Sequence, residues 1–182
     1  MAIHKVKISN FKCFKGLFEL ELNKGLNILV GNNETGKSTI LEAIHIALTG
    51  IYGGRNIKKE LSQYLFNREI VELYINSVNS GSPIPPPSIS IEIFFDGSIN
   101  PEYEGNNNSD RTPCEGLVCQ IAIDEKYLDE YNALVSKKNM MSLPIEYYEV
   151  TWIRFARQNV TIRGIPVKSV MIDSSNYRYQ NG

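Results

Sequence analysis

Alternation of apolar and polar residues marks the start of the chain. Residues 3–9 (IHKVKIS) and 17–22 (LFELEL) alternate with a period of two, which is typical of half-buried strands. Gly16 supplies a turn residue between them, so a hairpin is expected. The run GLNILV at 25–30 is almost continuously apolar and ends at Gly31, a pattern that predicts a strand buried on both faces of a sheet.

Helical periodicity begins at Ser38 and stops at Gly50, a residue that commonly ends helices. The apolar stripe of this helix consists of Ile40, Leu41, Ile44 and Leu48. A second helix is predicted over about 57–76. Its apolar face would consist of Leu61, Leu65, Ile70, Leu73 and Tyr74. Three consecutive prolines in the segment that follows favour an extended connector.

The second half of the chain is predicted to be mainly strands. One helix is predicted around 126–135, and a polar loop rich in Asn and Gly, which we expect to be mobile, covers 97–116. The predicted strands cover 89–95, 117–123, 145–155, 159–162 and 165–172. Short polar turns between successive strands indicate an antiparallel lobe, about 89–182, beside a first lobe of about 1–76.

Composition limits the number of domains, the kinds of partner and the cellular compartment that are expected for this protein. The 182 residues suffice for one domain with its own core, and a formal net charge of -1 gives no sign of a nucleic-acid-binding surface. Cys13, Cys114 and Cys119 lack metal-ligand spacing and are interpreted as free thiols in a reducing compartment. No stretch approaches the roughly 20 apolar residues of a membrane span, and the N-terminus lacks the apolar run of a signal peptide. We therefore expect a soluble cytoplasmic protein that does not bind a membrane.

The sequence GNNETGKST at 31–39 is the clearest functional motif in the chain. It matches GxxxxGK followed by Ser or Thr, and the required strand and helix are predicted on either side of it. Glycines let the backbone approach a triphosphate closely, and successive N–H groups with the helix dipole bind its oxygens. The motif therefore predicts ATP and Mg²⁺ as cofactors. Its candidate ATP-binding residues are Asn32, Asn33, Glu34, Thr35, Gly36, Lys37, Ser38 and Thr39.

Three side chains of this P-loop have distinct predicted roles. The Lys37 ammonium would reach the β and γ phosphates and is the candidate catalytic residue. The Ser38 hydroxyl would bind Mg²⁺, and Thr39 would hydrogen-bond the α phosphate. The alternative interpretation is a glycine turn that only caps a helix.

The first fifty residues resemble the start of the ATPase heads of the SMC, RecF and OLD (overcoming lysogenization defect) families. Besides the P-loop, the resemblance rests on Asn10, Phe11 and Lys12 between the first two strands and on the LEAI sequence at 41–44. It implies an α/β fold, a P-loop NTPase of the ABC-ATPase type with an antiparallel β lobe. In such heads the basic residue of this turn lies near the nucleotide, so Lys12 is a candidate ATP contact. The alternative for Lys12 is a solvated turn lysine.

After residue 50 the chain is most similar to the OLD-type ATPases, whose members join such a head to a C-terminal Toprim nuclease. This resemblance implies a role in DNA processing or phage defence. The implied partners of the full-length protein are DNA, a nuclease domain or subunit, and a second copy bound through the ATPase heads in a homodimer or higher oligomer. Heads of this class also carry a Q-loop glutamine near the metal. Gln63 is the candidate for that ligand, and a surface helix glutamine is the alternative.

Other parts of an ABC site are not evident. The sequence contains no LSGG-like signature, and neither His4 nor His45 lies late enough to be the switch histidine. LVCQIAIDE, which ends at Asp124 and Glu125, is similar to a Walker B strand, but the helix that follows favours a capping role for the acidic pair. We therefore expect the chain to be the first part of a longer protein and to hydrolyse ATP very slowly by itself.

Four hypotheses of function compete. The leading hypothesis is an ATPase module that regulates a nuclease or DNA-processing complex, in which ATP joins two heads and hydrolysis releases them. A RecF- or SMC-like DNA repair ATPase and an ATP-dependent assembly scaffold are the alternatives. A GTPase or kinase has less support, because the Asn23-Lys24 pair continues as Gly25-Leu26 and forms no NKxD motif.

Overall fold

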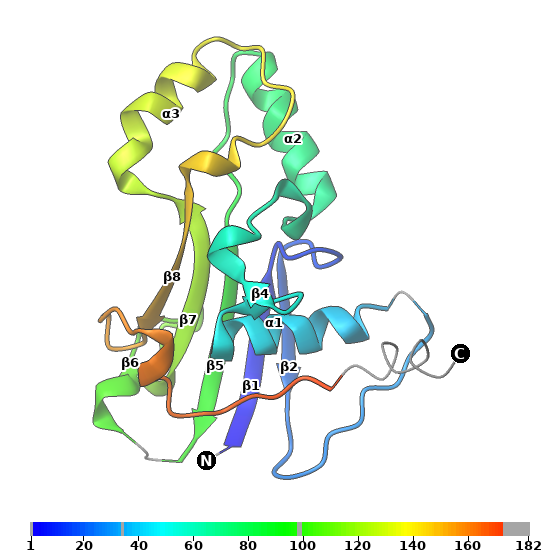
Figure 1. The fold of residues 1–182 in the computed structure, drawn as a ribbon, viewed down its shortest axis with the longest axis vertical. Coiled ribbons are helices and arrows are strands. Elements are labelled where there is room, and N and C mark those ends of the chain that lie inside the picture. Colours follow the sequence, from blue (N-terminus) through cyan, green and yellow to red (C-terminus); the bar gives the residue numbers. More distant parts are fainter. Residues whose placement is uncertain (1, 34, 98–99, 173–182) are drawn as a thin grey trace.

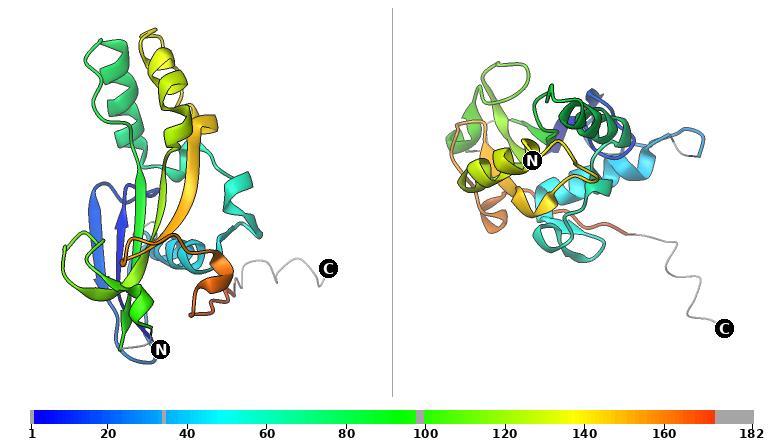
Figure 2. Two further views of the ribbon diagram at one scale, coloured as in Figure 1. Left: turned by 90° about the vertical axis from the view of Figure 1, so that its left-hand side faces the viewer. Right: turned by 90° about the horizontal axis from the view of Figure 1, so that it is seen from above.

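The computed structural model describes residues 2–33, 35–97 and 100–172. An antiparallel sheet lies at its centre, with helix α1 (Lys37–Thr49) across one face and two further helices at one end (Figures 1 and 2). Its strand order is β2-β1-β5-β7-β6, and β8 also pairs with β7. The strands are β1 (Ala2–Ser9), β2 (Leu17–Glu21), β5 (Ile89–Asp96), β6 (Glu104–Gly105), β7 (Cys114–Ile123) and β8 (Tyr148–Arg154).

The predicted opening hairpin is confirmed. β1 pairs with β2 in antiparallel register, with Val6 opposite Leu20 and Ile8 opposite Phe18. Val6 and Ile8 are fully buried, as the period-two pattern requires of one face. The other edge of β1 pairs with β5, so the hairpin and the later strands belong to one sheet and share one hydrophobic core.

The predicted helix after the P-loop is also confirmed. The residues that α1 buries are Ile40, Ala43, Ile46, Ala47 and Leu48. Gly50 ends the helix with φ +66°, and its N–H donates to the Ile46 carbonyl at 2.8 Å. A side chain at this position would be both strained and blocked, because a Cβ would lie 2.2 Å from Ile162 Cδ1. A small hairpin follows, formed by β3 (Ile51–Tyr52) and β4 (Arg55–Asn56).

The second helix begins later than predicted. Two short 3₁₀ turns, Ile57–Lys59 and Gln63–Leu65, come before α2 (Arg68–Asn79), and Phe66 between them and α2 is extended. Phe66 is buried and forms a bridge to Phe11 of the hairpin turn, so tertiary contact holds it out of a helix. The buried face of α2 therefore consists of Val71, Tyr74 and Val78, and Leu73, predicted to share that face, is 52% exposed.

The predicted helix around 126–135 is present. A 3₁₀ turn, Glu125–Tyr127, leads into α3 (Leu128–Val135). α2 and α3 stand side by side at one end of the sheet (Figure 2), and the buried hydroxyl of Tyr131 donates to that of Tyr74 at 2.7 Å. This hydrogen bond links the two helices.

The predicted strand at 25–30 is not formed. Leu26, Ile28 and Val30 are 84%, 75% and 89% exposed, whereas Leu29 packs against the core. A doubly buried strand needs hydrogen-bonded neighbours on its edges. None of the strands in the described part of the chain pairs with this segment. The prediction of a strand buried on both faces is therefore wrong for this structure.

Two strands predicted near the C-terminus are also wrong. Asn159 makes only an isolated bridge to Ile153, Ile162–Gly164 forms a 3₁₀ turn, and 165–172 has no regular structure. Pro166 removes a backbone donor from this stretch, which disfavours pairing. The segment instead runs alongside α1 and in front of β5 and β1 (Figure 1), with Ile165 buried against the core. The predicted strand at 145–155 is shorter, because its first three residues form a 3₁₀ turn before β8.

The loop predicted at 97–116 has more anchors than its composition indicates. Tyr103 is buried and its hydroxyl donates to the Gly164 carbonyl at 2.7 Å. Ser109 Oγ donates to Glu92 on β5 at 2.8 Å. Asp110 accepts from Lys5 at 2.8 Å and from Lys7, which is only 2% exposed, at 2.5 Å. The described part of this loop therefore covers the outer face of the sheet.

The Asp110 contacts predict a pH-dependent contribution to stability. Hydrogen bonds from Lys5 and then Lys7 lower the pKa of Asp110, so its stabilisation is present above the unfolded value near 3.9 and is lost as the pH falls through the lower folded value. Because the carboxylate is a third exposed, Asp110→Asn should lower the free energy of unfolding by only about 0.5–1.5 kcal/mol at pH 7.

Urea denaturation at several pH values would check this expectation. The difference between Asp110→Asn and the wild type should shrink as the pH falls, since the wild-type carboxyl is then protonated as well. Asp129→Asn, which changes an exposed carboxylate on α3, serves as the control. An Asp110→Asn chain as stable as the wild type at pH 7 would contradict the role given to this ion pair.

None of the helices in the described ranges is long and apolar enough to cross a membrane.

Candidate nucleotide-binding site

The P-loop lies at the N-terminal end of α1, beside the turn that joins β1 to β2 (Figure 1). Contacts of Gly36 define this arrangement. Gly36 has φ +87°, a left-handed conformation that favours glycine, and a Cβ built there would lie 2.9 Å from the Phe14 ring and 3.0 Å from Cys13 Sγ. The hairpin turn therefore approaches the loop so closely that a side chain at Gly36 would displace it.

Gly31 is required for a local reason. A Cβ at this position would lie 2.8 Å from Thr35 Oγ1, which is held in place by its own hydrogen bond to the Asn32 carbonyl at 2.9 Å. Gly31 and Asn32 thus lie close to Thr35. Both fixed glycines of the motif are explained by contacts within 3.0 Å.

The first turn of α1 presents donors suited to an anion. No side chain caps Gly36 at the start of the helix, and the first turn contains no acidic residue. The first intrahelical hydrogen bond runs from Ile40 N–H to the Gly36 carbonyl. The N–H groups of the preceding helical residues therefore have no partner four residues earlier and add to the positive end of the helix dipole. A phosphate group fits this end of α1.

Lys37 points back over the loop. Its ammonium donates to the carbonyls of Gly31 at 2.7 Å and Asn32 at 2.5 Å, and to Thr35 Oγ1 at 3.3 Å. These acceptors all belong to the phosphate loop itself. The ammonium thus already lies over the loop in which the phosphates are predicted to bind.

The other predicted P-loop residues surround the same helix end. Ser38 is exposed, as an Mg²⁺ ligand must be, and Thr39 Oγ1 lies 3.7 Å from Cys13 Sγ. Asn32 and Asn33 are exposed on the loop. Glu34 lies outside the described residues. The ATP and Mg²⁺ contacts of these residues stay predictions.

Lys12 lies in the β1–β2 turn that contacts Gly36. Its ammonium donates to Glu42 Oε2 of α1 at 2.5 Å and lies 4.9 Å from the centre of the Tyr52 ring. Burial would lower the pKa of Lys12, but hydrogen bonds to Glu42 and Tyr52 raise it overall, so the group stays protonated. Lys12 is therefore not a freely solvated turn lysine, and its predicted contact with ATP stays a prediction.

Gln63, the predicted metal ligand, makes a hydrogen bond to the backbone that was not predicted. Its Oε1 accepts from the Leu143 N–H at 3.1 Å, in the loop that follows α3. It lies in a 3₁₀ turn and not in a surface helix, and it lines a cavity of about 570 Å³ together with Lys12 and residues of α2. Metal ligation by Gln63 would have to share or replace the Leu143 contact, and it stays a prediction.

Asp124, the first residue of the acidic pair after β7, acts as a cap. Asp124 precedes the 3₁₀ turn and accepts from the Lys126 N–H at 3.0 Å. β7 is antiparallel to both β5 and β8, and its final residues lie at the α3 end of the sheet (Figure 1). The capping interpretation is confirmed for Asp124.

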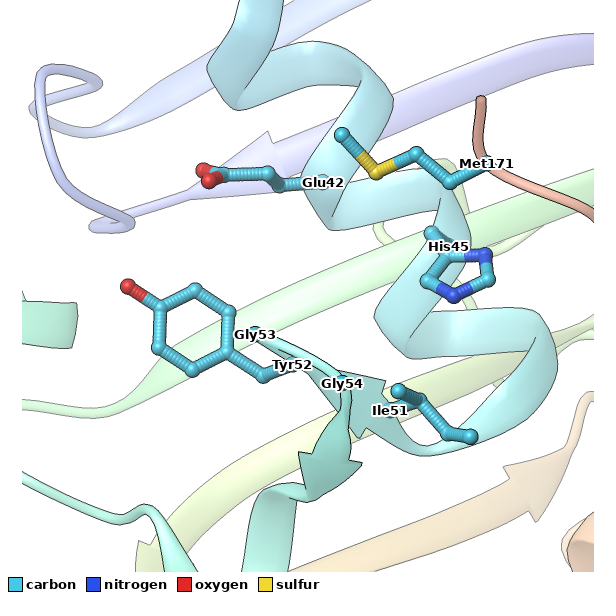
Figure 3. Close-up of a pocket in the computed structure, with 7 residues that line it drawn as sticks. All are labelled: Glu42, His45, Ile51, Tyr52, Gly53, Gly54 and Met171. Atoms are coloured by element: carbon cyan, nitrogen blue, oxygen red, sulfur yellow. The ribbon is translucent and has the colours of Figure 1, made fainter. Parts of the chain in front are cut away.

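Two residues near the P-loop were missed by sequence reasoning. Glu42 and Tyr52 hold Lys12, and both also line a cavity of about 290 Å³ with His45 and Met171 (Figure 3). This cavity contains no P-loop residue, so it is not the phosphate site. His45 Nδ1 lies 3.2 Å from Ser169 Oγ in the segment that runs alongside α1. For Glu42 a signal existed, since it is four residues after Ser38 and hence on the same face of α1.

A protein-family model described as an AAA domain, AAA_23, matches residues 5–178. The chain belongs to this family. Together with the P-loop before α1 and the antiparallel sheet, the match establishes a P-loop ATPase fold of the ABC type.

Several curated proteins that are similar to this AAA_23 domain have names that refer to DNA replication and repair or to chromosome maintenance. The DNA replication and repair protein RecF of Clostridium tetani is 32% identical over 75 residues, which cover 41% of this chain and 20% of that protein. RecF of Clostridium botulinum strain ATCC 19397 is 32% identical over 97 residues, covering 53% and 25%. Structural maintenance of chromosomes protein 6 of Saccharomyces cerevisiae is 56% identical over 46 residues, covering 25% and 4%.

A solved structure also resembles the chain. It is described as "Structural biochemistry of ATP-driven dimerization and DNA stimulated activation of SMC ATPases", with a TM-score of 0.47 and 18% identity over 91% of this chain and 75% of that one. The aligned region spans a quarter or less of each curated relative named above. The family assignment thus covers the ATP-binding fold, while activities of whole relatives enter only as proposals.

Proposed function

We propose that the chain is the nucleotide-binding part of an ATPase head that binds ATP·Mg²⁺ and, in the full protein, switches a DNA-processing complex. The observation that carries the proposal is the uncapped N-terminus of α1 behind a loop whose glycines admit no side chain and whose Lys37 ammonium lies over the loop. Bound ATP would supply the γ phosphate for transfer. Lys37, Ser38 and the N–H groups of α1 would hold the ATP·Mg²⁺.

Within this proposal, the remaining catalytic groups come from outside the 182 residues. Phosphoryl transfer requires groups that position water and offset developing charge, and Lys37 supplies only part of that set. Asp124 is engaged in capping and follows β7, an antiparallel strand. Leu26, Ile28 and Val30 are exposed in this chain. In the proposed complete head, a further strand beside 25–30 would cover them.

The specific type of head is a finer part of the proposal. One candidate is an OLD-like head that regulates a nuclease in DNA processing or phage defence. Its support is the arm of α2 and α3, which is joined to antiparallel strands. A RecF- or SMC-like repair ATPase is the second candidate, favoured by 32% identity to RecF over 97 residues. In either, two heads would join when ATP binds. A head that binds ATP but scarcely hydrolyses it would instead act as an assembly scaffold.

Three free cysteines agree with a reducing, cytoplasmic setting for this head. Cys119 is buried, Cys114 is partly buried and Cys13 is exposed beside the P-loop, and no disulfide joins them. Cytoplasmic location is part of the proposal.

Calorimetry and phosphate release would test the proposed function. The wild-type chain should bind ATP·Mg²⁺ in preference to GTP and release phosphate very slowly at all protein concentrations. Replacing Asp124 with Asn and Glu125 with Gln together should leave both binding and residual turnover unchanged, because Asp124 caps the 3₁₀ turn that follows β7 and Glu125 begins that turn. Because the Asn side chain keeps an acceptor oxygen for the Lys126 N–H, the cap should be retained and the free energy of unfolding should change little.

Robust turnover by the wild type that disappears in the double variant would show that Asp124 and Glu125 serve as a Walker B pair. Preference for GTP would count against an ATPase. Nucleotide-dependent oligomerisation of the full-length protein without turnover would favour the scaffold.

A further inference from the structure

The backbone of Lys12 is fixed independently of its side chain. Its N–H donates to the Leu65 carbonyl at 2.9 Å, and its carbonyl accepts from Asn67 Nδ2 at 2.9 Å. Lys12 has φ +49°, so it occupies the left-handed region that turns a chain sharply. The neighbouring Phe11 is fully buried. A change that alters only the contacts of the Lys12 ammonium should therefore leave this turn in place.

The ammonium itself is held by two side chains from the P-loop helix and the hairpin after it. Glu42 Oε2 accepts from Lys12 Nζ at 2.5 Å, and the two side chains are 27% and 25% exposed. Tyr52 provides the second contact, through a hydrogen bond and a ring centre at 4.9 Å. Figure 3 shows the Glu42 carboxylate and the Tyr52 hydroxyl pointing to the same side of α1. An ammonium has three N–H donors, so one is left for another acceptor.

The position of this cluster relates it to the phosphate loop. Glu42 lies four residues after Ser38, on the same face of α1 and one turn from the helix end that is suited to a phosphate. The residues that follow Lys12 in the turn contact the start of that helix, since Cys13 Sγ lies 3.7 Å from Thr39 Oγ1. Lys12 thus places its ammonium beside the second turn of α1, one turn from the helix end that is suited to a phosphate.

We propose that Glu42, assisted by Tyr52, is a positioning residue that holds the Lys12 ammonium where its remaining donor meets the bound nucleotide. The inference rests on the proposed function, in which Lys12 contacts ATP. A lysine side chain has several rotatable bonds, and holding it in place before binding removes the entropy cost of ordering it on the ligand. Without Glu42 the ammonium would move toward solvent and bind ATP less well.

A double-mutant cycle tests the inference, because a merely structural role of Glu42 would not depend on Lys12. ATP affinity would be measured by calorimetry, with Mg²⁺ present, for the wild type, Glu42→Gln, Lys12→Met and the double variant. Glu42→Gln should weaken ATP binding about 5- to 20-fold in the wild-type background. It should have no further effect in the Lys12→Met background. Glu42→Asp, which keeps a carboxylate, should restore most of the affinity.

The same turn provides a matched control. Lys15 pairs with Glu69 of α2 at 2.7 Å, and both are largely exposed. Glu69→Gln removes an ion pair from the same turn but should leave ATP affinity unchanged. Wild-type affinity in Glu42→Gln, or an equal loss in both Lys12 backgrounds, would overturn the inference. If the wild type itself does not bind ATP, the proposed function fails, a result that is distinct from these.

Discussion

Replacing Lys37 with alanine should lower the affinity of the chain for ATP by about 10- to 150-fold while leaving the fold intact. The change removes one charge-assisted contact, worth about 1.5–3 kcal/mol. Among the described residues, the Lys37 ammonium contacts acceptors of the phosphate loop alone, at Gly31, Asn32 and Thr35, so the core loses nothing. Calorimetric titration with ATP·Mg²⁺ would measure the affinity, and circular dichroism would confirm that the fold is retained.

Lys59→Ala is the control for a general loss of positive charge, since Lys59 is exposed in the 3₁₀ turn after β4. It should bind ATP as the wild type does. Unchanged binding in Lys37→Ala would refute the assignment of 31–39 as a nucleotide-binding P-loop.

Replacing Trp152 with alanine should have the largest effect on stability, lowering the free energy of unfolding by about 3–5 kcal/mol. Trp152 lies on β8, is almost fully buried, and donates from Nε1 to the Ala47 carbonyl of α1 at 3.0 Å. It therefore joins the sheet to the helix that carries the P-loop. Its removal would leave a large cavity against α1 and take away the partner of that carbonyl.

Urea denaturation monitored by circular dichroism would measure this loss. Trp152→Phe keeps an aromatic ring in the core but removes the donor, and should cost less than the alanine variant. It also keeps the expectation testable if the alanine variant does not fold. A Trp152→Ala chain within about 1 kcal/mol of the wild type would mean that β8 and α1 are not held together by this side chain.

Local sequence patterns predicted well those elements whose stability comes from near neighbours. The hairpin of β1 and β2 follows from alternation and Gly16, and α1 follows from a helical stripe between two glycines. The start of α2 could not be predicted in this way. Phe66 is extended because it bridges to Phe11, a residue 55 positions earlier in the chain, and this contact prevents a helix that its own segment would allow.

Apolar runs gave wrong predictions for segments whose strand formation depends on a neighbouring strand. The segments 25–30 and 165–172 contain enough apolar residues for strands, but neither pairs with a strand in the described part of the chain. A run of apolar residues indicates only that a segment can be buried, and hydrogen-bonded neighbours determine whether it becomes a strand. The same limit applies to Asp124, whose resemblance to a Walker B residue ends once β7 is seen to be antiparallel to both neighbours.

The sequence by itself determined the phosphate loop, because every residue that the motif needs lies within nine positions and its glycines, lysine and helix start are local features. It also determined the first hairpin and the class of fold, a P-loop ATPase of the ABC type. Only the tertiary structure decided what surrounds the loop. The turn of β1 and β2 lies against Gly36, Trp152 holds α1 to the sheet, and Glu42 meets Lys12 across 30 residues. Such contacts depend on how separate elements pack, and no local periodicity encodes them.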